Sequence, residues 1–73
     1  MAKIEVKSEI TGSVWKIITK PSDPIASGDA LMILESMKME IPVIAEDGGT
    51  IVEIMVIEGQ PVSEGQVVAV IEG

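Results

Sequence analysis

The chain has 73 residues, of which 12 are acidic and 5 are lysines, so its net charge at pH 7 is −7. This balance disfavours binding to nucleic acid or to an anionic membrane, because neither would find a basic patch on the protein. Cysteine and histidine are absent, which excludes disulfides, thiolate nucleophiles and the commonest general base and metal ligand. We expect a single domain, residues 1–73, and its core is expected to be aliphatic because Trp15 is the sole aromatic residue of the chain.

The expected compartment depends on what the sequence lacks. No apolar run reaches the roughly 18 residues that a membrane-spanning helix needs. The start of the chain, residues 1–5, has no apolar segment like that of a signal peptide. We therefore expect a cytoplasmic protein, or one of an organelle matrix if the domain belongs to a larger enzyme.

Local patterns predict strands rather than helices along the whole chain. Near the start, Ile4 and Val6 alternate with polar Glu5 and Lys7, which is the period of a half-buried strand. Four later segments are short, rich in apolar and β-branched residues and bounded by Gly, Pro or polar residues. We expect these strands at residues 14–19, 30–34, 51–57 and 67–71.

The segments between these strands are predicted loops, at residues 20–29 and 58–66, because Pro, Gly, Ser and Asp are frequent in them. Each loop contains one isolated apolar residue, Ile25 in the first and Val62 in the second. We expect both side chains to point into the core.

The chain also contains an internal repeat with a period of 37 residues, the distance from Gly12 to Gly49. The identities that fall in register at this period include Gly12 with Gly49, Ile17 with Ile54, Pro24 with Pro61, Gly28 with Gly65, and Glu35 with Glu72. Two equivalent sets of short antiparallel strands can bury their apolar faces only against each other. The sequence thus predicts an all-β fold, a flattened β-barrel or sandwich with pseudo-two-fold symmetry.

Lys38 is the candidate functional residue. It lies in Glu35-Ser36-Met37-Lys38-Met39-Glu40, between two apolar segments, and it is the only lysine after Lys20. This pattern predicts the tip of a β-hairpin that presents one amine to solvent. Because Glu35 and Glu72 are equivalent in the repeat, we expect the tip and the two chain ends at opposite ends of the domain.

Several roles are open to this lysine on the residues alone. The simplest is a solvated turn lysine that keeps the surface polar. A Schiff-base amine must be uncharged, and the neighbouring carboxylates of Glu35 and Glu40 favour the charged form instead. Metal binding is disfavoured because Glu35, Glu40, Glu46 and Asp47 do not have the spacing of a ligand set.

The two methionines beside the lysine are unusual at a strand turn, where Gly, Asn or Asp is typical. One of them could fold back onto the hydrophobic end of the sandwich. Alternatively, Met37 and Met39 could form a soft contact surface for a partner, because a flexible thioether adapts its shape.

The hexapeptide around Lys38 resembles the biotin-attachment motif of biotinyl domains, whose core is Met-Lys-Met with biotin on the lysine. The similarity covers nearly the whole chain: Gly12-Ser13-Val14-Trp15-Lys16 resembles the first glycine-led strand, Gly28-Asp29 and Gly65-Gln66 the two loop glycines, and Gly48-Gly49-Thr50-Ile51 the return strand. Ser36 replaces a frequent alanine, a change from one small residue to another. No insertion resembles the protruding thumb of some bacterial biotin carboxyl carrier proteins. The resemblance implies a thumbless barrel-sandwich hybrid of two antiparallel four-stranded sheets.

The same resemblance implies a carrier rather than an enzyme, with no catalytic or metal-binding residues of its own. In the family, a biotin protein ligase joins biotin to the lysine, here Lys38, through an amide. A biotin carboxylase then carboxylates the biotin, and a carboxyltransferase transfers the carboxylate to an acceptor. The tip residues expected to serve recognition are Glu35, Ser36, Met37, Met39 and Glu40. The isolated domain is expected to be monomeric, without nucleic-acid or membrane partners.

Three other interpretations remain. A lipoyl carrier domain of a 2-oxoacid dehydrogenase complex shares the fold and the hairpin lysine, but such domains typically have Asp-Lys-Ala at the tip. An H-protein-like carrier would have extra elements that this chain lacks. An unmodified docking module would use the hairpin as a contact surface only.

Overall fold

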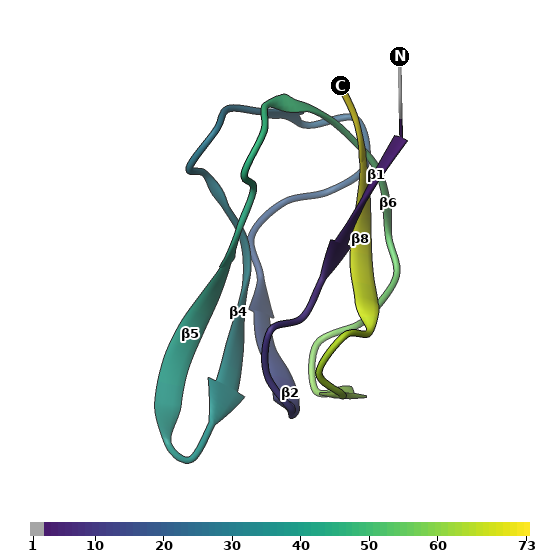
Figure 1. Ribbon diagram of the computed structural model, residues 1–73. Helices are drawn as coiled ribbons and strands as arrows, with labels where there is room; N and C mark the ends of the chain where they lie inside the picture. The colour runs from purple at the N-terminus through teal and green to yellow at the C-terminus, as the bar shows by residue number, and fades with distance from the viewer. Residues whose placement is uncertain (1–2) are drawn as a thin grey trace.

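Residues 3–73, the part of the chain that the computed structural model describes, form β-strands and turns without any helix. The strands are β1 Lys3–Lys7, β2 Gly12–Ile17, β3 Pro24–Ile25, β4 Ala30–Ser36, β5 Met39–Ile44, β6 Gly49–Ile54, β7 Pro61–Val62 and β8 Val67–Glu72. They make two antiparallel four-stranded sheets, in the orders β1-β8-β6-β3 and β5-β4-β2-β7 (Figure 1). The predicted all-β fold of two such sheets is confirmed. Over these residues, nothing resembles a helix that is long and apolar enough to cross a membrane.

The repeat in the sequence is also a repeat of the strand pairing. Val14 pairs with Leu34 in one sheet, and the equivalent residues Ile51 and Ile71 pair in the other. Each pair of residues between β1 and β8 has an equivalent pair between β5 and β4. Even the irregularities repeat, because the register of β2 shifts at Trp15 and that of β6 shifts at Val52. The two halves of the chain therefore fold by the same local rules.

Aliphatic side chains from both sheets fill the space between them. The largest fully buried ones are Leu31, Met32, Leu34, Ile51, Ile71, Val14 and Val68. Each such side chain stabilises the fold by about 1.5–3 kcal/mol through removal of apolar surface from water. Ile25 and Val62 are buried as predicted. Trp15 is 48% exposed, so the core contains no aromatic ring.

Two predictions about local structure need correction. The two predicted loops each contain a short strand, because β3 pairs with β6 and β7 pairs with β2 over two residues. The strands predicted at 14–19 and 51–57 end earlier, at Ile17 and Ile54, where the chain leaves one sheet for the other. Ile54, the last residue of β6, is only partly buried and packs against the core cluster.

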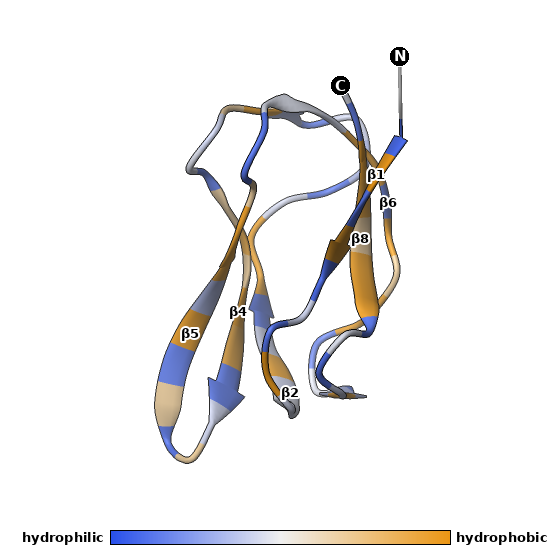
Figure 2. Cartoon of the chain, in the orientation of Figure 1, coloured by the Kyte–Doolittle hydropathy of each residue, from blue (hydrophilic) through white to orange (hydrophobic). Residues whose placement is uncertain are grey.

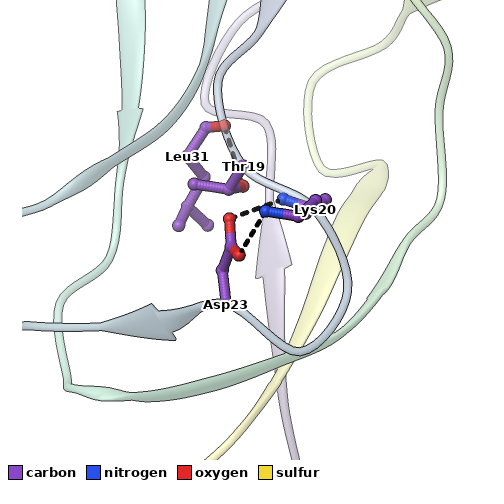
Figure 3. A network of polar contacts seen from close by, with 4 residues as sticks. All are labelled: Thr19, Lys20, Asp23 and Leu31. Carbon is purple, nitrogen blue, oxygen red and sulfur yellow. Dashed lines mark hydrogen bonds and ion pairs between the residues drawn. The ribbon is translucent and has the colours of Figure 1, made fainter.

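Equivalent turns follow β2 and β6 and direct the chain across to the other sheet. In the first, the Lys20 N–H donates to Asp23 Oδ2 over 3.0 Å, and Lys20 Nζ lies 3.0 Å from Asp23 Oδ1 (Figure 3). In the second, the Ile57 N–H donates to Gln60 Oε1 over 3.2 Å. A carboxylate and an amide oxygen therefore close the same turn in the two halves.

The β4–β5 hairpin extends beyond the body of the sandwich at one end, and the start of β1 and the C-terminus lie at the other end (Figure 1). The described residues span 36 Å along the long axis and 18 × 17 Å across it. In Figure 2 the strands are largely hydrophobic in the body of the sandwich and polar towards the hairpin end. The expected opposite placement of the tip and the chain ends is thus observed.

Candidate functional site

The hairpin turn consists of Met37 and Lys38, between the paired residues Ser36 and Met39. The backbone φ angles are 52° at Met37 and 64° at Lys38, so both residues adopt the left-handed conformation. Two-residue hairpins favour such turns because their twist matches that of the strands, and they normally place Asn or Gly there. For residues with larger side chains, this conformation costs roughly 1–2 kcal/mol each. The strained turn therefore holds the lysine at the apex of the hairpin.

Lys38 and the two methionines beside it are exposed to solvent. Met37 is 92% exposed and Met39 63% exposed, so neither methionine folds back onto the sandwich. Lys38 is exposed too, and within residues 3–73 the one ion pair is that between Lys20 and Asp23. The Lys38 amine is therefore not held by a carboxylate of the described chain, and a large group attached to it would meet no steric obstacle.

The base of the hairpin is fixed to the loop between β1 and β2. The Ser36 hydroxyl donates a hydrogen bond to the carbonyl oxygen of Thr11 over 3.1 Å. Gly12 approaches the Glu35 carbonyl so closely that a Cβ at this position would collide with it. The Thr11 hydroxyl in turn accepts a hydrogen bond from the Glu64 N–H over 3.1 Å. These contacts position a solvent-exposed tip on a rigid base.

The acidic residues of the motif lie directly opposite each other. Glu35 of β4 pairs with Glu40 of β5, one position before the Ser36–Met39 pair that closes the turn. Both side chains are exposed. The tip therefore presents one cation beyond a pair of anions. Residues 3–73 contain no group of three acidic side chains that could hold a metal ion.

The structure brings together at one tip all six residues of the predicted motif. Sequence reasoning did not anticipate the left-handed backbone at Met37 and Lys38 or the contact of Ser36 with Thr11. The left-handed backbone could have been inferred, since a two-residue turn between paired strands favours positive φ whatever residues occupy it. The contact of Ser36 has no signal in the sequence, because its partner is a backbone carbonyl 25 residues away.

The sequence model of the family described as "Biotin-requiring enzyme" matches residues 3–71. A biotinylated protein TB7.3 homologue from Mycobacterium leprae is 42% identical over 67 residues, which cover 92% of this chain and 94% of that protein. This chain belongs to the biotin/lipoyl-attachment family.

Solved structures show the same fold in two settings. Urea carboxylase from Kluyveromyces lactis superposes with a TM-score of 0.93 and 35% identity, over 99% of this chain but 6% of that enzyme. The lipoyl domain of the 2-oxoglutarate dehydrogenase complex from Azotobacter vinelandii gives a TM-score of 0.73 and 27% identity, over 86% of this chain and 80% of that domain. The fold is thus found both within a carboxylase and in a lipoyl domain, and the fold alone does not distinguish the two cofactors.

Proposed function

We propose that the protein is a biotin carrier of a biotin-dependent carboxylase, with biotin attached through an amide to the Nζ atom of Lys38. The observation that carries the proposal is the placement of this one amine at the apex of a strained, exposed turn between two methionines. The Mycobacterium leprae relative, whose name describes it as biotinylated, and the carboxylase that superposes on the chain support the choice of biotin.

The residues around Lys38 provide access rather than catalysis. Their side chains are acids, a hydroxyl and thioethers, and the chain has no His, Cys or Arg to activate an amine or an acyl group. The domain has no group that activates the carboxyl of biotin, so a ligase must supply both the activated biotin and the base. Bound biotin would supply the carboxyl-carrying chemistry, while the protein supplies the tether and its recognition.

Within this function, each tip residue has a proposed role. Met37 and Met39 offer exposed, adaptable apolar contacts to a biotin protein ligase and to carboxylase components. Glu35 and Glu40 give the tip its negative charge, and Ser36 fixes the hairpin to the body of the domain. A biotin carboxylase and a carboxyltransferase would then act in turn on a group carried by a small, monomeric domain of the cytoplasm.

A lipoyl carrier is the second candidate, since the lipoyl domain of Azotobacter vinelandii shares the fold. The residues on either side of the lysine favour biotin, because Met37 and Met39 stand where lipoyl domains typically have aspartate and alanine. An unmodified docking module is the third, and the same experiment tests all three.

The test is intact mass spectrometry of the full chain after coexpression with a biotin protein ligase and biotin, or with a lipoyl ligase and lipoate. We expect one biotinyl group, and peptide mapping should locate it on Lys38. Lys38→Arg, which keeps the charge but cannot form the amide, should remain unmodified and should melt at the same temperature as the wild type. Lys7, Lys16 and Lys20, which precede Lys38 in the chain, serve as internal controls in the same peptide map.

A lipoyl group on Lys38 would reassign the chain to the oxoacid dehydrogenases. Absence of both groups would contradict the carrier function and favour the docking module. Biotin that persists in Lys38→Arg would contradict the assignment of the attachment site but not of the cofactor.

A further inference from the structure

The duplicated fold provides an internal comparison of its two outer faces. On the sheet β1-β8-β6-β3, Val70 lies between Glu5 of β1 and Glu53 of β6. The residues that line an open depression on this face are Lys3, Glu5, Lys7, Val52, Glu53 and Val70. Most of these side chains are charged, as expected of a face that remains in water.

The other sheet, which carries the lysine hairpin, has different residues at the equivalent positions. Ile33 stands in the place of Val70 and lies between Lys16 of β2 and Pro42 of β5. Pro42 thus replaces Glu5. Trp15 replaces Val52 at the β-bulge, the position where the register of the strand shifts. Trp15 is 48% exposed, and Pro42 is exposed as well. We call Trp15, Ile33 and Pro42 the outer apolar row.

Apolar residues in this row, of which Ile33 is half-buried, are not a requirement of the fold, because the other sheet has the same pairing with smaller or charged residues. Trp15 is the sole aromatic residue of the protein, yet it lies outside the core. An exposed apolar row of this kind marks a contact surface, and tryptophan is the residue most enriched where binding energy concentrates. The difference between the two faces therefore points to a partner of the hairpin-carrying sheet.

The row is continuous with the lysine hairpin. Successive side chains of a strand alternate between the two faces of a sheet, so Glu35 shares the outer face with Ile33, and Glu40 shares it with Pro42. Because Glu35 and Glu40 pair with each other, the acidic pair lies between the row and Lys38. An enzyme that binds the hairpin tip can therefore contact the outer apolar row at the same time.

We propose that the outer apolar row is the docking surface for the biotin carboxylase that acts on lysine-bound biotin, an inference that rests on the proposed function. The partner surface has an apolar patch to cover Trp15 and basic side chains to face Glu35 and Glu40, which lie at the border of the row. A second copy of this chain is the alternative occupant, and the oligomeric state in solution tests it.

The repeat supplies matched variants that test this proposal. Trp15→Val gives the bulge of β2 the residue that the bulge of β6 already has, and Val52→Trp makes the reverse change on the other face. The double variant Trp15→Val with Val52→Trp keeps the composition and net charge. Each protein is first loaded with biotin on the full chain and verified by intact mass. Its KM and kcat are then measured with a purified biotin carboxylase that also accepts free biotin, and the oligomeric state is measured by light scattering.

We expect KM for the loaded domain to rise ~10-fold in Trp15→Val and in the double variant, as for loss of a tryptophan contact. The value of kcat should not change, and Val52→Trp should behave as the wild type. Equal KM values in all four loaded proteins would overturn the inference and leave the proposed function intact. A wild type that is dimeric through Trp15, and monomeric in Trp15→Val, would overturn it in favour of self-association. Failure of the wild type to load biotin would instead contradict the proposed function.

Discussion

Glu35 and Glu40 lie directly opposite each other in the hairpin, whereas the equivalent residues of the other sheet, Glu72 and Lys3, have opposite charges. Like charges at paired positions destabilise an antiparallel sheet, and opposite charges stabilise it. At this pair, the sheet that presents the candidate lysine is therefore the less favourable one electrostatically. Such a local conflict, at a place where the other sheet has an oppositely charged pair, is typical of residues kept for recognition.

From this pair we predict that Glu40→Lys, which copies Lys3, stabilises the domain by about 0.5 kcal/mol at low salt. The gain should diminish in 1 M salt, because both side chains are exposed and their interaction is screened. Chemical denaturation at the two salt concentrations measures it. Glu9→Lys makes the same charge change in an exposed loop and serves as the control. Equal gains in both variants would show that net charge, rather than this pair, is responsible.

A second prediction concerns the strained turn. Met37→Asn should stabilise the domain by about 0.5–1 kcal/mol, because asparagine tolerates the left-handed conformation better than methionine does. No burial is lost, since Met37 is 92% exposed. The free energy of unfolding measures the gain. Met39→Asn is the control, since Met39 lies in β5 and asparagine is disfavoured in strands. A loss of stability in Met37→Asn would mean that the methionine makes contacts that outweigh its strain.

The two loop glycines permit a third prediction. Gly28 and Gly65 have φ angles of 92° and 87°, and a Cβ added at either position would meet no atom within 4 Å. Valine at either position should therefore destabilise the domain by about 1–3 kcal/mol through backbone strain alone. The two losses should be nearly equal, because the loops are equivalent, and thermal or chemical denaturation compares them.

The control for this prediction is Gly59→Ser. Its equivalent in the first half, Ser22, already adopts a φ of 79° without being glycine. Serine at position 59 should thus cost no more than about 1 kcal/mol. Unchanged melting of Gly28→Val and Gly65→Val would show that these loops can relax to another conformation.

Much of the fold could be predicted because the same pattern of strands occurs twice in the sequence. The 37-residue repeat determines which segments are equivalent, so weak local signals in one half are supported by those in the other. The two-residue strands β3 and β7 were predicted as loops because Pro24 and Pro61 read as turn residues, and only the partner strands β6 and β2 give them hydrogen-bonding neighbours. Their pairing is a tertiary property that no local pattern contains.

The depth of burial was less predictable than the strands themselves. Ile51 and Ile54 look alike in the sequence, but Ile51 is 2% exposed and Ile54 lies at the margin of the core. The bulge at Val52 changes which side chains point inward after it, and a bulge has no reliable signal in this sequence. The candidate site was easier to predict than the depth of burial, because an exposed hairpin tip depends on local sequence far more than on packing.

The final prediction concerns pH and the turn that Asp23 closes. Hydrogen bonds from the side chain and the backbone N–H of Lys20 lower the pKa of the Asp23 carboxyl below its ordinary value of 3.8. The folded state therefore holds the ionised form more strongly than the unfolded state does. The resulting stabilisation is fully present above pH 3.8 and is lost as the pH falls through the lowered pKa. Carbon-detected NMR titration should give Asp23 a midpoint below 3.8.

Two variants separate the causes of this shift. Lys20→Met removes the ammonium but leaves the backbone N–H, so the midpoint of Asp23 should move upward toward its ordinary value. Asp23→Asn should be less stable than the wild type at pH 7, and the difference should shrink below pH 3.8, where the wild type becomes protonated. Gln60 shows that a neutral side-chain oxygen can close the equivalent turn, so this variant should still fold. A stability difference between Asp23→Asn and the wild type that persists through the acid range would contradict the ion pair and assign the effect to turn geometry alone.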